Sequence, residues 1–161
     1  MEESANSSGS SDLEKEEVWD RMLTRLALTD YPKLETVLPK ILPYSISSLS
    51  SGSHAIRKKV MEILTHLNKR VKHQKSIRLP VMELWKEYVE VGASLIVRNF
   101  CMIYIEMAFD RLTAEEKADM APMLIANISK FPLQHQDILL RIVMKVQLQV
   151  EVLLQNQGFI L

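Results

Sequence analysis

The chain has 161 residues, of which 20 are basic and 20 acidic, so its net charge is zero. That balance argues against a protein whose whole surface binds a polyanion, and four glycines with few β-branched runs argue against an all-β fold. A single cysteine rules out a disulfide within the chain and fits a reducing compartment.

The N-terminal segment 1–12 is predicted to be a disordered, serine-rich acidic tail, because it carries five serines and no large apolar anchor. It lacks the basic and apolar regions of a signal peptide. The longest apolar stretch, 100–109, is too short to span a bilayer. We therefore expect a location in the cytoplasm and nucleus. A lead helix is predicted over 13–28, where Val18, Met22 and their neighbours follow helical spacing.

Three helix pairs are predicted to follow the lead helix, at 30–75, 78–111 and 113–156. In the first pair, Asp30 is a candidate N-cap with Pro32 in the first turn, and Ser53 can cap the partner helix. In the second pair, Ser94 can play the same part. The third pair opens with a capping box at Thr113, which has a glutamate three residues later.

The last segment of the chain is harder to interpret. From Val146 to Val152, apolar and polar residues alternate, a period of two that suits a strand or a poorly specified helix. We expect a helix through about Leu154, followed by an apolar tail at 157–161.

Proline and arginine recur along the chain with the same period. Pro39, Pro80 and Pro122 are 41 and 42 residues apart, and Arg57, Arg98 and Arg141 follow them by 18, 18 and 19 residues. A period of roughly 40 to 47 residues is typical of HEAT and armadillo solenoids, although it does not separate HEAT from other α-solenoids. We predict an all-α, HEAT/armadillo-type α-solenoid of about three and a half helix-pair repeats over 13–156. The prolines should bend the first helix of each pair. The arginines should bond to carbonyls or carboxylates of the adjoining repeat.

Basic charge is concentrated in one part of the chain, which we call the basic strip, 57–78. It holds eight lysines and arginines and one acid, Glu62, whereas segment 1–20 holds seven acids and one lysine. The candidate partner-binding residues are Arg57, Lys58, Lys69, Arg70, Lys72 and Lys75. Four interpretations remain open: a solvated face, a site for an acidic segment of a protein partner, a site for the chain's own acidic N-terminus, or an RNA site. The aromatic residues that single-strand binders interleave with basic ones are missing from the strip.

No catalytic, cofactor-binding or metal-binding residues are predicted. His66 and His73 are seven residues apart, but no cysteine or carboxylate pair completes a metal site. Cys101 lies on an apolar stripe, where a free cysteine is usually a small core residue. Glu83 and Glu87 fit a solvated helix face better than an acid–base pair. We therefore expect a binding protein and not an enzyme.

Several stretches resemble the proteasome adaptor and scaffold family of very long HEAT-repeat proteins. They are 20–28, 42–50, 57–73, 97–100, 104–109 and 132–141, and the likeness covers roughly 13–146. The resemblance implies proteasome subunits as partners and a role in tethering the regulatory particle to the core particle and monitoring assembly. It also implies coupling of proteasomes to vesicles, endoplasmic-reticulum quality control and motor proteins. It implies no catalytic residues.

The chain departs from that family in two ways. It is long enough only for the N-terminal few repeats, and its end after about Val146 does not resemble the family's continuation, which is typical of a truncated or alternatively spliced product. The open end of a solenoid exposes apolar surface. We therefore expect the C-terminal end to stack on further repeats or to self-associate.

Overall fold

The chain folds into helices that stack side by side. A computed structural model describes residues 7–158, and no strand occurs in that range. The α-helices are α1 (Ser7–Leu28), α2 (Tyr31–Ser47), α3 (His54–His73), α4 (Val81–Val89), α5 (Leu95–Asp110), α6 (Ala114–Ile125) and α7 (Leu133–Asn156), and two short 3-10 helices are η1 (Ser48–Ser50) and η2 (Ile128–Lys130). The predicted all-α solenoid is confirmed.

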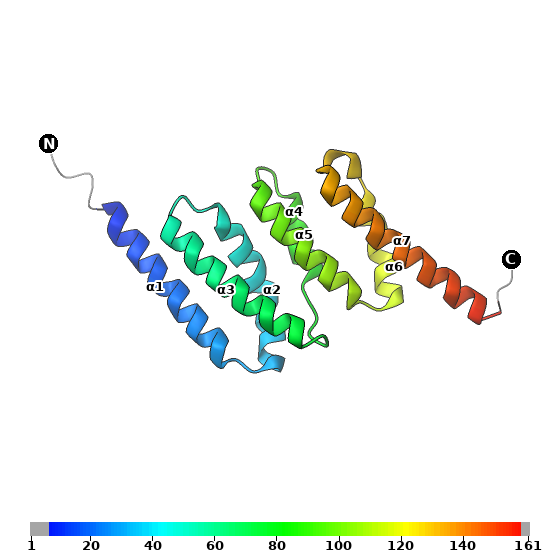
Figure 1. Ribbon diagram of the computed structural model, residues 1–161, viewed down its shortest axis with the longest axis horizontal. Helices are drawn as coiled ribbons and strands as arrows, with labels where there is room; N and C mark the ends of the chain where they lie inside the picture. The colour runs from blue at the N-terminus through cyan, green and yellow to red at the C-terminus, as the bar shows by residue number, and fades with distance from the viewer. Residues whose placement is uncertain (1–6, 159–161) are drawn as a thin grey trace.

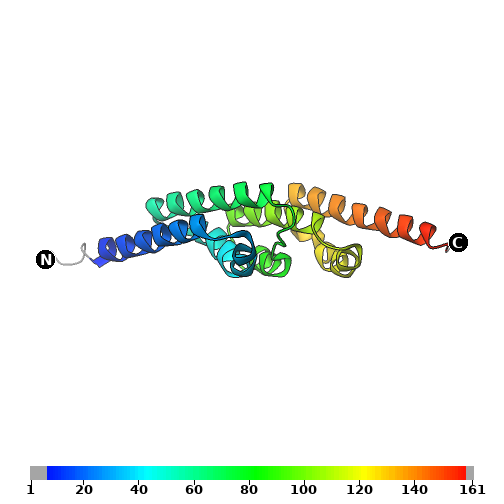
Figure 2. The same ribbon diagram turned by 90° about the horizontal axis from the view of Figure 1, so that it is seen from below.

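The helices form two layers. Figure 1 shows α1, α3, α5 and α7 in one layer, with α2, α4 and α6 behind them, and Figure 2 shows the same two layers from the edge. The second helix of each pair packs on the helix before it, which gives the pairs α2–α3, α4–α5 and α6–α7. Helix α1 packs on α3 instead. The three pairs fall within the ranges 30–75, 78–111 and 113–156, and their assignment as HEAT repeats stays a prediction.

The predicted N-caps form as expected. The side chain of Asp30 accepts a hydrogen bond from the amide of Lys33 at 3.0 Å, and Ser53 and Ser94 cap α3 and α5 in the same way. At the start of α6, the Thr113 hydroxyl accepts from the amide of Glu116, and the Glu116 carboxylate accepts from the amide of Thr113 at 2.9 Å. Each cap satisfies amides that have no partner within the helix.

The disorder predicted at the N-terminus needs correction, whereas the predicted extent of the last helix does not. The disorder predicted for 1–12 is wrong from Ser7 onward, because α1 begins there, while 1–6 lie outside the described residues. Extending an existing helix costs far less than nucleating one, and Trp19, which is buried, anchors α1 further along. At the other end, α7 runs to Asn156, so the helix expected through about Leu154 is confirmed. Of the predicted tail 157–161, residues 159–161 lie outside the described range.

The helices share one hydrophobic core between the two layers. On α3 the spacing of the apolar residues gives one stripe, and this stripe is buried: Ile56, Val60, Ile63, Leu64, Leu67 and Val71. Cys101 of α5 is fully buried, and burial raises the pKa of its thiol to about 12. The thiol is therefore a neutral core group, as the sequence predicted.

The three recurrent prolines do not occupy equivalent places. Pro39 lies inside α2 and Pro122 inside α6, as predicted. Pro80 is the N-cap of α4, so the prediction that it bends a helix is wrong. A helix start tolerates proline because the amide there has no intrahelical partner.

The three recurrent arginines also differ from one another. Arg141 of α7 pairs with Glu106 of α5 at 2.9 Å, which is the predicted contact with an adjoining pair. Arg57 donates to the carbonyl of Ser51 at 2.6 Å, within its own pair, and the Nε of Arg98 is buried without a hydrogen-bond partner. The prediction therefore holds for Arg141 and is wrong for Arg57.

Two other arginines, Arg70 and Arg111, join successive helices of the α1–α3–α5 layer. We call them the carbonyl-binding arginines. Arg70 of α3 donates to the carbonyls of Leu26 and Thr29, where α1 ends. Arg111, which follows α5, donates to carbonyls where α3 ends, at 2.8 Å to Val71, 2.8 Å to Ile77 and 3.3 Å to Gln74. Their positive charge also faces the negative end of the helix dipole. Each arginine therefore caps the C-terminal end of the neighbouring helix.

A buried polar cluster joins the second and third pairs. The hydroxyl of Tyr88 on α4 lies 2.9 Å from Nδ1 of His135 on α7, and Nε2 of His135 lies 2.8 Å from Oδ1 of Asn99 on α5. Because Oδ1 only accepts, Nε2 carries the proton and Nδ1 accepts from the tyrosine. His135 is 3% exposed, so the cluster holds a neutral imidazole inside the core.

The neutral His135 predicts a pH-dependent stability. Burial first, and then the charge of Arg98, lower the pKa of His135 from its ordinary value of 6.5. Below about pH 6.5 the imidazole of His135 is protonated in the unfolded chain but stays neutral in the folded chain, where its pKa is lower. The stability contributed by neutral His135 is therefore complete above that pH, and it is lost as the pH falls toward the folded-state pKa.

Urea unfolding between pH 7.5 and pH 5 should show this loss of stability, and His135→Gln should make the loss smaller. An equal pH dependence in the variant would contradict the assignment to His135.

Candidate partner-binding surface

The structure places the six candidate partner-binding residues along α3 and just after it. Arg57, Lys58, Lys69, Arg70 and Lys72 lie on α3, and Lys75 lies in the loop to α4. All four lysines are exposed, whereas the two arginines are half-buried. The lysines and the arginines therefore have different surroundings, although the sequence groups them together.

Both candidate arginines are engaged inside the chain. Arg57 binds the carbonyl of Ser51. Arg70 binds two carbonyls at the end of α1, and its guanidinium lies 5.0 Å from the centre of the Tyr31 ring. A cation over an aromatic face is a stabilising contact. We therefore keep the prediction of partner contact for the four lysines, Lys58, Lys69, Lys72 and Lys75.

Part of the basic strip meets the acidic half of the lead helix within the chain. Lys59 of α3 pairs with Asp20 of α1 at 2.7 Å and lies 4.0 Å from Glu62. The hydrogen bond to Asp20 is the main cause of the raised pKa of Lys59, together with the charges of both acids. The Lys59–Asp20 ion pair is a contact of the kind expected if the basic strip holds the chain's own acidic N-terminal segment.

Two of the four lysines share a hollow with the following helix. The hollow has a volume of about 450 Å³ and is lined by Lys72, Lys75, Met107, Asp110 and Arg111. Arg111 is held there by its carbonyl partners, and its partial burial lowers its pKa. Three cationic side chains against the single carboxylate of Asp110 give the hollow a net positive charge, which suits a carboxylate of a partner.

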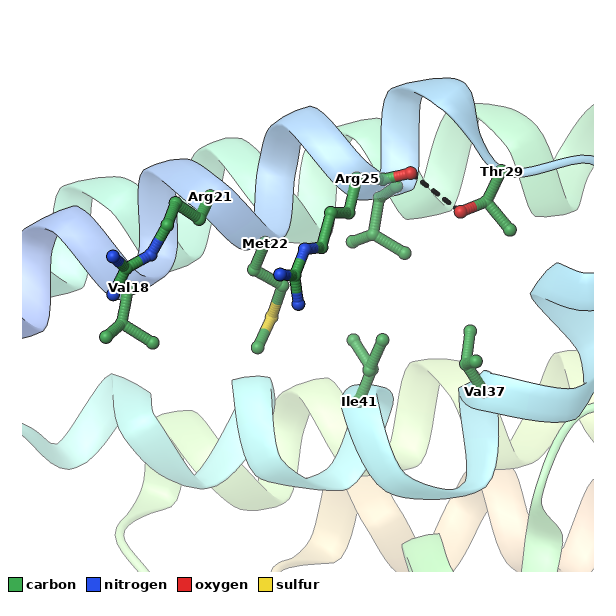
Figure 3. Close-up of a pocket in the computed structure, with 8 residues that line it drawn as sticks. Val18, Arg21, Met22, Arg25, Thr29, Val37 and Ile41 are labelled. Carbon is green, nitrogen blue, oxygen red and sulfur yellow. Dashed lines mark hydrogen bonds between the residues drawn. The ribbon is translucent and has the colours of Figure 1, made fainter.

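A second groove, which the sequence analysis missed, lies between α1 and α2 (Figure 3). Its volume is about 530 Å³. Its lining comes from one face of each helix: Val18, Arg21, Met22, Arg25, Leu26, Thr29, Val37 and Ile41. The signal was present in the spacing of Val18, Arg21, Met22 and Arg25, which all fall on one side of a helix. The helical spacing of Val18 and Met22 was used only to predict the lead helix.

Neither a metal-binding cluster nor a membrane-spanning helix occurs in the part of the chain that the structure describes. Within 7–158, no three histidine, cysteine or acidic side chains gather where they could hold a metal ion. None of the described helices is both long enough and apolar enough to cross a membrane.

Comparisons with known proteins identify a matching family and several relatives. A family model described as "Proteasome component ECM29, N-terminal" matches residues 20–157. "Proteasome adapter and scaffold protein ECM29" of Homo sapiens is 39% identical over 125 residues, which cover 76% of this chain and 7% of that protein. "Proteasome-associated protein ECM29 homolog" of Drosophila melanogaster is 31% identical over 131 residues, which cover 81% of this chain and 7% of that protein.

A yeast relative has a similar match. "Proteasome component ECM29" of Saccharomyces cerevisiae is 30% identical over 127 residues, which cover 74% of this chain and 7% of that protein. The chain therefore spans about 7% of the length of each of these curated relatives. No solved structure matches the chain significantly.

Proposed function

We propose, from the premise that this chain belongs to the ECM29 N-terminal family, that it is a segment of a proteasome-associated scaffold. The observation that carries the proposal is the family match over residues 20–157. It is supported by relatives named as an adapter and scaffold of the proteasome and as a component of it. The resemblance noted in the sequence is thereby confirmed. The predicted departure from the family after about Val146 is wrong, because the match continues to residue 157.

The shape of the chain suits such a role. A solenoid is stabilised by contacts between neighbouring helix pairs, so its long outer faces are left for partners. We propose that the segment is non-enzymatic and helps to link regulatory and core particles, or to tether proteasomes to other cellular structures. With this role we propose a location in the cytoplasm and nucleus, and association with vesicles or the endoplasmic reticulum through partners.

The proposed contact with the proteasome uses the lysines of the basic strip. Lys58, Lys69, Lys72 and Lys75 are exposed, and no ion pair within the described residues occupies them. We propose that they hold an acidic protein segment. The alternative, an RNA partner, would use the same lysines through phosphate contacts.

The immobilised chain is expected to capture purified proteasomes. Lys69→Glu, Lys72→Glu and Lys75→Glu together should reduce that capture about tenfold, because they reverse the charge that meets the partner. Arg70 is left unchanged because it holds α1. A matched control is Lys130→Glu with Lys145→Glu, two exposed lysines on other surfaces, which should leave capture unchanged.

The outcomes separate the parts of the proposal. Failure of the unmodified chain to retain proteasomes would contradict the scaffold role for this segment. If capture survives the triple change, the proposed lysine contact is contradicted, but the scaffold role is not. Salt-sensitive binding of single-stranded RNA that the triple change abolishes would favour the alternative.

The C-terminal end offers a further surface for stacking. Apolar residues on α7 recur every four positions and are exposed, namely Leu140, Met144, Leu148 and Val152. Such a stripe is what the next helix pair of a solenoid covers. We propose that it stacks on further repeats or on a second copy of the chain.

A further inference from the structure

The groove between α1 and α2 is a place in the solenoid where a helix is missing. Helices α3, α5 and α7 each pack on a helix of the other layer that precedes them in the chain. Helix α1 lies in the layer of α3, and no described residue supplies such a helix for it. Its side toward the second layer is therefore open, and the groove of about 530 Å³ lies there.

The floor of this groove is apolar. Met22, Val37 and Ile41 are partly buried against the core, and Val18 is 44% exposed. Figure 3 shows Val37 and Ile41 of α2 pointing toward α1, and Met22 of α1 pointing toward α2. These residues form two facing apolar rows, which is the arrangement that receives the apolar side of an amphipathic helix.

The rim of the groove is positively charged. Arg21 and Arg25 lie one turn apart on α1, and both are exposed. Figure 3 shows both guanidinium groups on the groove side of the helix. Neither forms an ion pair within 7–158. Two cations at this spacing complement two carboxylates that are also one helical turn apart.

The described carboxylates of α1 form no ion pair with this rim. Asp12, Glu14, Glu16 and Glu17 lie on α1 itself, N-terminal to the two arginines. Asp20 is paired with Lys59 on the side of α1 that faces α3. Glu17 lies one helical turn before Arg21 on the same side of α1 but forms no ion pair with it, so both guanidinium groups are without an ion-pair partner among the described residues.

We propose that the groove between α1 and α2 docks an acidic amphipathic helix of another protein. Its apolar side chains lie on Met22, Val37 and Ile41, and its carboxylates pair with Arg21 and Arg25. The bound helix occupies the open place beside α1 and extends the layer of α2, α4 and α6. The inference does not depend on proteasome binding.

Charge-swapped peptides test the proposal on the full chain. The probe is a synthetic helical peptide with leucines at i, i+3, i+4 and i+7 and two glutamates, four residues apart, on the flank of that leucine stripe. In a second peptide lysines replace the two glutamates, and in a third serines replace the leucines. Fluorescence anisotropy should show the glutamate peptide binding about tenfold more tightly than either of the others.

The chain itself supplies the matching variants. Arg21→Glu with Arg25→Glu should reverse the preference, so that the lysine peptide binds more tightly. Lys130→Glu with Lys145→Glu changes the same number of charges at exposed positions away from α1 and α2 and should leave the preference unchanged. Circular dichroism confirms that each variant keeps its helix content, which is expected because all four side chains are exposed or at the rim.

Three results would overturn the proposal. The first is equal binding of the glutamate and lysine peptides by the unmodified chain. The second is a preference that survives Arg21→Glu with Arg25→Glu. The third is a dimer of the chain, seen by analytical ultracentrifugation, that dissociates in that same double variant, because the groove would then hold a second copy.

Discussion

Replacing Tyr88 by alanine is expected to lower the free energy of unfolding by about 4 kcal/mol. Tyr88 is fully buried. Its ring stacks on Trp85 with centroids 5.2 Å apart, meets Phe131 edge-on at 5.2 Å, and its hydroxyl bonds to His135 at 2.9 Å. Phe131 and His135 belong to the third helix pair. The substitution therefore leaves a cavity and also weakens the joint between the second and third pairs.

Urea unfolding followed by circular dichroism measures the effect. Because the stability of a solenoid is a sum over neighbouring units, we expect an earlier unfolding step for α6 and α7. Tyr88→Phe keeps the rings and should cost about 1 to 3 kcal/mol, since it leaves Nδ1 of His135 buried without a donor. A loss below about 1 kcal/mol for Tyr88→Ala would contradict the role of this joint.

Replacing Arg111 by alanine is expected to lower the free energy of unfolding by about 3 kcal/mol. The guanidinium donates to three carbonyls where α3 ends, at Val71, Gln74 and Ile77. Hydrogen bonds to a charged group are stronger than neutral ones, and the carbonyls left behind are only partly open to water. The loss should appear as a lower urea midpoint with little change of the slope.

A lysine at the same position is the matched control. Arg111→Lys keeps the charge near the negative end of the α3 dipole, but it replaces a planar fork by a single ammonium group. It should recover about half of the loss. If lysine restores full stability, charge alone explains the contact. If alanine costs nothing, Arg111 does not hold the two helices together.

The local features of the fold were predictable from the sequence. Asp30, Ser53, Ser94 and Thr113 all cap helices as expected. A cap joins a side chain to an amide only three residues away, so its rule depends on little besides the local sequence. The α3 stripe was predictable for the same reason, since one helix fixes the spacing of its own apolar face.

The contacts between helices were harder to predict from the sequence. Arg70 reaches the carbonyl of Leu26, which is 44 residues earlier, and no local pattern reports that distance. Arg70 and Arg111 are themselves 41 positions apart, so the repeat period was visible in them as well. Arg57 and Arg98 are also 41 positions apart, but Arg57 binds a carbonyl within its own helix pair.

The candidate binding surface was predicted in part. The concentration of positive charge on α3 is a property of composition, and the exposed lysines are where the sequence placed them. That two arginines of the strip hold the chain together could not be read from charge, because charge does not show which cations have partners. The groove beside α1 depends on which helix α1 packs against, and the sequence of α1 alone does not determine that.

The carbonyl-binding arginines bear on how freely this chain can change during evolution. They recognise main-chain oxygens, which every amino acid provides, so the identity of the side chain at Thr29 or Gln74 is immaterial to the joint. Side chains near the ends of α1 and α3 can therefore be substituted without changing how α1, α3 and α5 are joined. Keeping Arg70 and Arg111 would then preserve these two junctions while the surrounding surface diverges toward new partners.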